Sequence, residues 1–376
     1  MNNIPYLLAL HSINGLGPIR LKAILDYFKD PKLAWEANEE DLLKLGIYRN
    51  TINLLVETRK TLEPETYARK IEDSGIKWIT IFDESYPKLL AQIYDPPIVL
   101  YFKGEPDWNK KAIGIVGTRK ITGYGSVVTE QFTKGLVGAG LTIVSGLARG
   151  VDAKAHLTAV LEKGRTIAVL GGGLNNIFPP ENRNLAARIA DGFGAVISEF
   201  PPSYPSLPGN FPARNRIISG LSEAVLVIEA AEDSGSLITA RFALEQGREV
   251  FAVPGPITSD LSKGPIDLIK EGARAVFSPE EILEELGINR VKNLESKNLL
   301  ASSQDLATAS CLRVGSEKDL SEDEKKVLQS LENENRHIDE IGRELKFPSP
   351  KISALLLKME ISGLVQSMGA GIYCKK

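Results

Sequence analysis

The stretch Lys111–Gly125, KAIGIVGTRKITGYG, decides the fold class of this chain. Its apolar run Ala112–Val116 does not alternate with polar residues, which is typical of a parallel strand buried on both faces. A turn that contains Gly117 follows, and apolar positions then recur at helical spacing over Val127–Val137. The stretch therefore predicts a strand, a glycine turn and a helix, which is the repeating unit of an α/β sheet.

The same unit repeats toward the C-terminus. Further apolar runs, which we predict as parallel strands, occur at Leu141–Val144, Thr166–Leu170, Ala195–Ile197, Ala224–Ile228 and Val250–Val253. Amphipathic segments such as Leu237–Gln246 lie between them. The alternation predicts an α/β fold with an extended Rossmann-like, doubly wound parallel sheet, in which the loops at the carboxyl ends of the strands bind the ligand.

The segments on either side of the sheet predict two smaller domains. Residues 4 to about 60 indicate short helices, and Gly15 and Gly17 fit either the hairpin of a helix-hairpin-helix or two helix caps. Ser321 and Glu324 have the spacing of a capping box, and two more helices and a β-wing are expected after it, as in a winged helix. We expect an N-terminal helical domain of the SAM or helix-hairpin-helix type at 1–75, a Rossmann-like domain at 76–286, a polar linker at 287–320 and a winged-helix-like domain at 321–376.

The composition is that of an ordinary globular protein. The 376 residues are 43% hydrophobic and 25% charged, and no run of eighteen apolar residues would span a bilayer. Cys311 and Cys374 lie far apart and lack a metal-ligand spacing, so neither a disulfide framework nor a zinc site is expected. The first residues do not have the pattern of a secretory signal. We expect a cytoplasmic protein without a membrane segment and without a metal or other cofactor.

The net charge of −3 does not by itself favour a nucleic-acid ligand, because phosphate binding requires a positive field. The distribution of charge is uneven, however. The segment Lys110–Ala275 holds 18 Lys and Arg against 15 Asp and Glu, whereas the rest of the chain is acidic. A local basic pocket in the Rossmann-like domain is therefore compatible with the overall charge.

Five loops at successive strand ends combine glycine, hydroxyl or amide side chains, and arginine. Glycine lets a ligand approach the backbone, arginine matches the geometry of a phosphate, and an aromatic ring stacks on a base. The candidate binding residues are Gly117, Thr118 and Arg119; Ser145, Gly146 and Arg149; Gly171 and Gly172; Phe211, Arg214, Asn215 and Arg216; and Ser234, Gly235 and Ser236. Because the loops share one edge of the predicted sheet, we expect them to line one pocket.

The first of these loops resembles a phosphate-binding junction. A strand ends at Gly117 and a helix begins near Tyr124, so we expect free backbone amides and the positive end of a helix to face an anion, with Arg119 beside them. The Gly-x-Gly-x-x-Gly spacing of a dinucleotide site is absent from this turn.

Each candidate also has an ordinary structural interpretation. Glycines at strand ends form turns, arginines form surface ion pairs, and Phe211 fits a core position. Ser234 fits a helix N-cap as well as a phosphate loop. Asp152 and His156 are better explained as a capping aspartate and a packed histidine than as a catalytic pair. The convergence of five such loops favours a binding site.

The motifs of residues 80–275 resemble the DprA/Smf family in content and order. They are Gly117-Thr118-Arg119, Ser145–Asp152, Thr166–Gly171, Phe211–Leu221, Ser234–Ala240 and Ala252–Gly255, preceded by Tyr86-Pro87 and Asp95–Tyr101. The resemblance implies a non-enzymatic homodimer that binds single-stranded DNA without sequence preference. It also implies that the protein loads the recombinase RecA onto that DNA during natural transformation.

Carried over by position, the resemblance also implies roles for single residues. Arg119 is the strongest phosphate contact, Ser145 and Gly146 line the pocket, and Phe211 supports a base. The opposite wall consists of Arg214, Asn215 and Arg216. One departure matters, because some relatives carry lysine where this chain has Pro180. That basic contact is missing here unless Arg183 or another residue replaces it.

The alternative function is that of an enzyme. Nucleotide phosphoribohydrolases of the lysine-decarboxylase-like family have a similar sheet and a Pro-Gly-Gly-x-Gly-Thr-x-x-Glu motif. The corresponding loop here, residues 233–240, reads DSGSLITA and lacks the glutamate. Nothing in the sequence replaces it, neither a Ser-His-Asp set nor paired carboxylates nor a metal cluster.

Overall fold

The computed structural model describes residues 2–288, 321–331, 336–361, 364–369 and 371–375. The chain divides into two compact units, Met1–Lys292 and Asn293–Lys376, and each is described by itself. All but the first two residues of the linker expected at 287–320 lie outside the described residues. The domain boundaries expected from the sequence stay a prediction.

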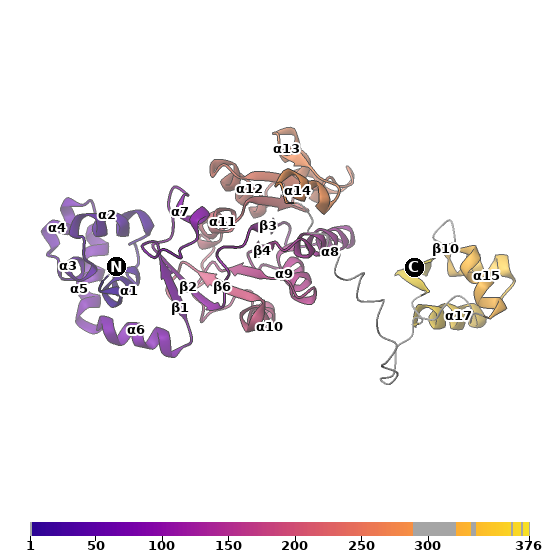
Figure 1. Cartoon of the computed structure of the whole chain (residues 1–376), viewed down its shortest axis with the longest axis horizontal. Coiled ribbons are helices and arrows are strands. Elements are labelled where there is room, and N and C mark those ends of the chain that lie inside the picture. The colour runs from indigo at the N-terminus through magenta and orange to yellow at the C-terminus, as the bar shows by residue number, and fades with distance from the viewer. Residues whose placement is uncertain (1, 289–320, 332–335, 362–363, 370, 376) are drawn as a thin grey trace, which may run out of the picture. The chain divides into compact units, whose positions relative to one another are not determined.

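Six helices form the N-terminal part of the first unit, at the indigo end of the chain in Figure 1. They are α1 (Ile4–His11), α2 (Pro18–Phe28), α3 (Pro31–Glu36), α4 (Glu39–Lys44), α5 (Arg49–Thr61) and α6 (Pro64–Asp73). Leu7, Leu21 and Ile24 are fully buried, and their core continues to Tyr101 of the sheet. Gly17 is the N-cap residue of α2, a position that both interpretations of this glycine allow.

A nine-stranded sheet forms the centre of the first unit, in the order β1-β2-β6-β5-β4-β3-β7-β8-β9. Its strands are β1 (Lys77–Thr80), β2 (Val99–Gly104), β3 (Ala112–Val116), β4 (Thr142–Ser145), β5 (Thr166–Val169), β6 (Gly194–Ser198), β7 (Ala224–Val227), β8 (Glu249–Ala252) and β9 (Arg274–Ala275). The pairs from β6 through β9 are parallel, whereas β2 pairs antiparallel with both β1 and β6. The predicted α/β sheet is confirmed, and each of its six predicted strands lies within one residue of the observed ends. The strands that the sequence did not predict, β1, β2 and β9, extend the sheet at its two edges.

Helices cover both faces of this sheet (Figure 1). One core contains residues of α8 (Gly123–Gly138), α9 (Val151–Leu161) and α14 (Pro279–Glu285), and the other contains residues of α11 (Asn210–Gly220), α12 (Gly235–Glu245) and α13 (Lys263–Lys270). Strand β7 contributes Ala224 and Leu226 to the first core and Val225 and Val227 to the second. The short elements are α7 (Lys88–Ala91), η1 (Pro180–Asn182), α10 (Arg183–Arg188), η2 (Ile189–Phe193) and η3 (Asp260–Ser262). The chain thus leaves β3 toward one face and the adjacent β7 toward the other, and the loops after these two strands diverge.

The second unit is a winged helix, as predicted. It consists of α15 (Glu322–Ser330), β10 (Arg336–His337), α16 (Ile338–Leu345), α17 (Ser349–Ile361), β11 (Val365–Gly369) and β12 (Ile372–Lys375). Ser321 and Glu324 form the expected capping box at the start of α15. Val327, Ile341 and Leu356 are fully buried where the three helices meet.

The buried imidazole of His156 makes the stability of the first unit depend on pH. His156 lies on α9 with Nδ1 2.7 Å from Thr166 Oγ1, and burial lowers its pKa from 6.5 to about 3. Below pH 6.5 the unfolded chain takes up a proton that the folded chain does not, so stability is lost as the pH falls. Going from pH 7 to pH 5 should remove up to about 2 kcal/mol of the unfolding free energy through this group.

Denaturant titration at the two pH values tests this dependence. Tryptophan fluorescence reports on the first unit alone, because Trp35, Trp78 and Trp108 all belong to it. The difference between the two pH values should be smaller in His156→Gln than in the unmodified chain. An equal difference would show that His156 does not carry the effect.

Candidate functional site

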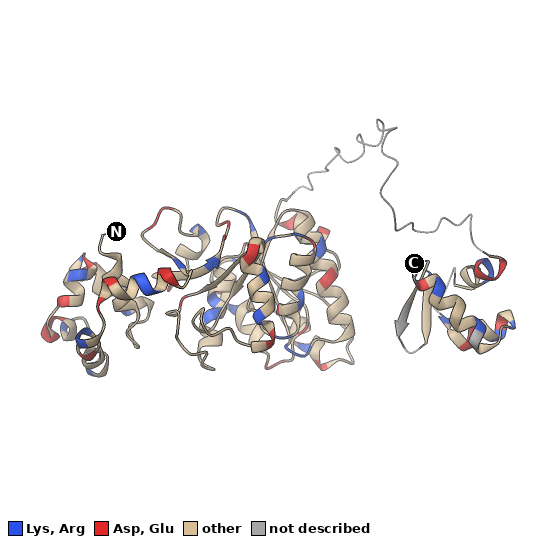
Figure 2. Cartoon of the chain, turned by 90° about the horizontal axis from the view of Figure 1, so that it is seen from below, with Lys and Arg blue, Asp and Glu red and all other residues tan. Residues whose placement is uncertain are grey.

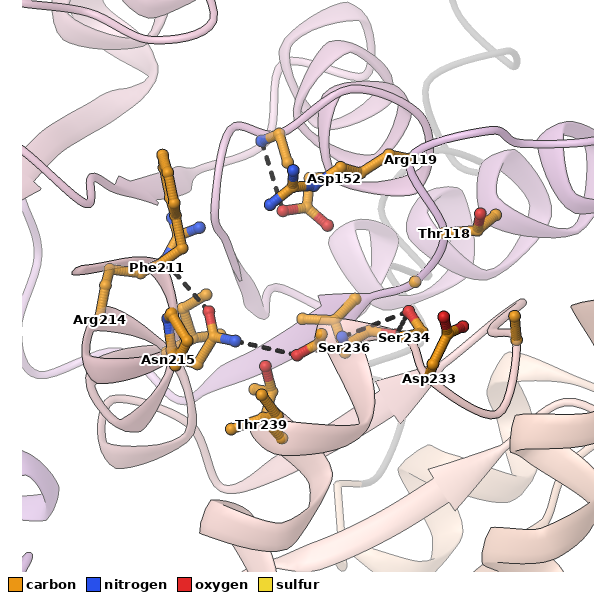
Figure 3. A pocket seen from close by; sticks show the side chains of 18 of the residues that line it. Thr118, Arg119, Asp152, Phe211, Arg214, Asn215, Asp233, Ser234, Ser236 and Thr239 are labelled. Carbon is orange, nitrogen blue, oxygen red and sulfur yellow. Dashed lines mark hydrogen bonds between the residues drawn. The ribbon is translucent and has the colours of Figure 1, made fainter. Parts of the chain in front are cut away.

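A pocket of about 590 Å³ opens at the carboxyl ends of the strands, where the loops after β3 and β7 diverge. Figure 3 shows its walls, with Phe211, Arg214 and Asn215 of α11 on one side, and with Ser234 of the loop after β7 and Ser236 of α12 below. The candidate residues that line it are Gly117, Thr118, Arg119, Phe211, Arg214, Asn215, Ser234, Gly235 and Ser236. All five predicted loops reach this pocket, because Ala148 and Asp152 of the second loop and Phe178, which follows Gly171–Gly173, also line it. The functions of these residues stay a prediction.

The loop after β3 is fixed at its base. The amide of Thr118 donates to the carbonyl of Glu229 at 2.6 Å, and the carbonyl of Thr118 accepts from the amide of Val151 at 3.1 Å. Gly150 has φ +74°, and a Cβ there would lie 2.2 Å from the Thr118 carbonyl oxygen, so only glycine fits this crossing. The next residue, Arg119, is exposed at the pocket and stands on a rigid support.

Arg119 lies over the ring of Phe211, which is itself paired with Phe178. Its guanidinium carbon lies 5.6 Å from the centre of the Phe211 ring, within the range of a cation–π contact. The Phe211 ring in turn lies 5.8 Å from that of Phe178, whose side chain is 47% exposed. A phosphate-matching fork and exposed ring surface therefore lie side by side.

The N-terminus of α8 does not line the pocket, contrary to expectation. The carboxylate of Glu229 accepts from Thr122 Oγ1 at 2.5 Å and from the amide of Thr122 at 3.1 Å. Thr122 Oγ1 also accepts from the amide of Gly125. The N-cap residue of the helix thus binds a carboxylate of the protein at the end where the sequence suggested a ligand anion.

Arg214 lines the pocket but is committed to the fold. It is 4% exposed, and its Nη1 donates to the carbonyl of Gly146 at 2.6 Å and to that of Val169. Burial lowers the pKa of this guanidinium to about 10, and Asp152 beside it opposes the shift. Arg214 thus ties the ends of β4 and β5 to α11, and Asp152 of α9 accepts from the amides of Gly146 and Ala148 in the loop after β4.

Arg216 does not supply a pocket wall, contrary to expectation. Its guanidinium is buried, donates to both carboxylate oxygens of Glu199 at 2.9 and 2.6 Å, and donates to Asp95 at 2.9 Å. Residues 214 and 216 lie about 200° apart around the helix, so they point to opposite sides. Arg216 therefore anchors α11 to the loops after β6 and before β2.

Other candidates lie behind the pocket or beside it. Ser145 is buried and donates from Oγ to the carbonyl of Ile115, and Gly171 and Gly172 are absent from the lining. A Cβ at Gly171 would lie 2.8 Å from the Phe211 ring, so this glycine makes room for the ring. Gly146 and Arg149 line an adjoining hollow of about 70 Å³. Arg149 forms an ion pair with Glu181 there.

Ser234, in the loop after β7, is both a helix N-cap and a residue that lines the pocket, so the structure agrees with both positions considered for it. Ser234 is the N-cap of α12 and accepts from the amide of Ser236 at 3.4 Å, and it also lines the pocket. Asn215 Nδ2 donates to the carbonyl of Gly235 at 3.1 Å and joins this loop to α11. The capping contact and the pocket therefore use the same turn.

Further lining residues were missed by the sequence reasoning, and they include Lys120, Phe178, Asp233 and Thr239. Lys120 is the basic residue that stands nearest in sequence to Arg119, and it is exposed. Its position directly after Arg119 was the signal in the sequence that could have identified Lys120 as a pocket residue. Arg183, the substitute considered for the missing lysine, does not line the pocket.

No group of three or more His, Cys, Asp or Glu residues is placed to hold a metal ion in the described part of the chain. The same residues form no helix that is long and apolar enough to cross a membrane.

This geometry defines an α/β protein with a pocket at the carboxyl edge of its sheet, and the pocket offers an exposed arginine and ring surface. A family model described as DNA recombination-mediator protein A matches residues 77–287, and the model of the DprA winged helix domain matches residues 313–371. The chain belongs to the DprA/Smf family of DNA-processing proteins.

Relatives and solved structures agree with this assignment. Protein Smf of Synechocystis is 38% identical over 96% of this chain and 96% of its own, and DNA processing protein DprA of Bacillus subtilis is 49% identical over 59% of this chain and 75% of its own. The DprA structure from Streptococcus pneumoniae superposes with a TM-score of 0.67 and 35% identity, covering 76% of this chain and 99% of that one. The Helicobacter pylori DprA structure, for which a single-stranded DNA binding mode is described, gives a TM-score of 0.51 at 30% identity and covers 56% of this chain and 95% of that one.

The different positions of Arg216 and Arg119 predict effects of very different size on stability. Arg216→Ala leaves Glu199 buried without its partner and should lower the unfolding free energy by about 3–5 kcal/mol. Arg119→Ala removes an exposed side chain and should change it by less than about 0.5 kcal/mol. Denaturant titration followed by tryptophan fluorescence measures both variants. Similar losses in the two would contradict the assignment of Arg216 to the fold and Arg119 to the pocket.

Proposed function

We propose that this protein binds single-stranded DNA, without sequence preference, in the pocket of the first unit. The observation that carries the proposal is the exposed guanidinium of Arg119 over the ring of Phe211. A backbone phosphate fits the arginine and Lys120, and a base fits the ring surface of Phe178 and Phe211. Every base has a ring face, so stacking of this kind does not select a sequence.

We further propose that the protein acts as a recombination mediator that loads RecA onto single-stranded DNA during natural transformation. The description of the matched family as a recombination mediator supports this role. The single-stranded DNA binding mode described for the Helicobacter pylori protein supports single-stranded DNA as the ligand. Loading would be measured as faster RecA filament formation on DNA that is already coated with a single-strand-binding protein.

The proposed function is non-enzymatic. The carboxylates that line the pocket belong to Asp152 and Asp233. Asp152 is bound to two loop amides, and His156 is buried against Thr166. Neither arrangement provides a nucleophile with an oriented base. Release of free base from a nucleoside monophosphate by the purified protein would instead support the phosphoribohydrolase alternative.

A homodimer is part of the proposal. Leu244 of α12, Ile257 and Phe277 are large apolar residues that are 52%, 90% and 70% exposed, and the last two flank residues 261–275 in the sequence. Contiguous exposed apolar patches are typical of contact surfaces, and we propose that these side chains contribute to one. Light scattering should give twice the chain mass of 41.0 kDa.

The winged helix is not expected to carry the main DNA contact. On α17, Lys351 pairs with Asp323 at 2.6 Å and Lys358 pairs with Glu324 at 2.8 Å, so both lysines are engaged within the unit. A chain that ends at residue 288 should therefore bind a single-stranded oligonucleotide within about threefold of the full chain. Fluorescence anisotropy with both proteins measures the ratio. A larger loss would assign DNA binding to the second unit as well.

Arg119→Ala should weaken binding of single-stranded DNA strongly without changing the fold. A charge-assisted phosphate contact contributes about 1.5–3 kcal/mol, which is a loss of roughly tenfold or more. Arg188→Ala is a matched control, because Arg188 is exposed on α10 and does not line the pocket. Anisotropy titrations at one salt concentration compare the variants. A loss below about threefold in Arg119→Ala would reject this pocket as the DNA site.

A further inference from the structure

Glu229 lies directly behind the loop that carries Arg119. It follows β7, it is 4% exposed, and it does not line the pocket. Its carbonyl accepts from the amide of Thr118, and its carboxylate accepts from the amide and the hydroxyl of Thr122. One residue therefore holds both ends of the segment 118–122.

The carboxylate also fills the first turn of α8. A Cβ built at Gly125 would lie 2.2 Å from Glu229 Oε2, so the absence of a side chain at Gly125 makes room for the carboxylate. A Cβ at Gly123, in the same turn, would meet nothing within 4 Å. The close approach is thus specific to Gly125 and to the side chain of Glu229.

This position is the one that a ligand phosphate takes in dinucleotide-binding sheets. There the first strand leads into a helix whose N-terminal amides and dipole hold the pyrophosphate. Here the corresponding strand is β3 and the helix is α8, and a negative side chain already occupies the helix end. A second anion at this end would be repelled by Glu229, and the repulsion grows with the charge of the ligand.

We propose that Glu229 is a specificity-determining residue that closes the helix end to terminal phosphates and pyrophosphate. A phosphodiester carries one negative charge, whereas a phosphomonoester carries about 1.5–2 near pH 7. The backbone phosphate of a polymer is therefore accepted by Arg119 and Lys120 at the pocket mouth, and free nucleotides are disfavoured. The proposal rests on the proposed function, since it explains how one pocket selects a DNA strand over its monomers.

The test compares two ligands in four full-length proteins. Pyrophosphate binding is measured by calorimetry, and binding of an oligothymidylate by fluorescence anisotropy. The proteins are the unmodified chain, Glu229→Gln, Gly125→Ala and the control Gly123→Ala. The glutamine removes the charge at nearly constant shape. The methyl group of Gly125→Ala displaces the carboxylate, which is the far end of a flexible side chain.

The ratio of pyrophosphate affinity to oligothymidylate affinity decides the matter. Charge effects at a helix terminus predict that Glu229→Gln raises this ratio by about 5- to 30-fold. Gly125→Ala should raise it in the same direction, and Gly123→Ala should leave it unchanged. A purely structural role of Glu229 would weaken both ligands together and leave the ratio constant. Ratios within about twofold of the unmodified chain in both Glu229→Gln and Gly125→Ala would overturn the proposal.

Failure of the proposed function has a different signature. In that case the unmodified chain does not bind oligothymidylate, whatever Glu229→Gln does to the affinity for pyrophosphate. The calorimetric comparison still measures whether Glu229 keeps anions away from the helix end. A gain of pyrophosphate binding in Glu229→Gln supports the role of this residue, and the absence of a gain contradicts it.

Discussion

The position of β3 between β4 and β7 is the constraint on which the site depends. All three strands are parallel, and the helices that follow β3 and β7 cover opposite faces of the sheet. The loops after β3 and β7 therefore run toward opposite faces of the sheet and diverge at its carboxyl edge. The pocket is the space that this divergence leaves, and Arg119 stands at one side of it. Any parallel sheet with this strand order provides such a space, whereas the side chains around it are particular to this chain.

Most charged residues around the pocket hold its walls in place, and few of them are exposed to a ligand. Of the basic residues that line the pocket, Arg214 is bound to two carbonyls, and only Arg119 and Lys120 are exposed. Arg216, two residues further along α11, is bound to Glu199 and Asp95. An arginine inside a motif can therefore stabilise the fold, as Arg214 and Arg216 do, or be exposed to a ligand, as Arg119 is. The direction in which it leaves its helix decides which role it has.

This distinction limits what the sequence could predict. The strands were predicted well because both faces of each strand are buried, and burial leaves a continuous apolar run such as Ala112–Val116. The pocket could be placed at the carboxyl ends of the strands for the same reason. The partners of Arg216 and Thr122 could not be predicted, because Glu199 and Glu229 lie 17 and 107 residues away in the sequence. Residues 117–125 likewise resemble a phosphate-binding loop in sequence, but the helix end there is occupied by the carboxylate of Glu229.

The pocket has few exposed basic residues, and this affects how it would bind a strand of DNA. Figure 2 shows Lys and Arg interspersed with Asp and Glu along the helices, in keeping with the net charge of −3. A pocket with two exposed basic residues neutralises one or two phosphates, and such a contact alone is weak and only slightly dependent on salt. Affinity for a polymer then has to come from several pockets that engage one strand together, because linked sites raise the effective concentration of each contact. The proposed DNA binding and the proposed dimer are therefore physically connected, since each additional copy of the chain adds one more Arg119 to the same strand.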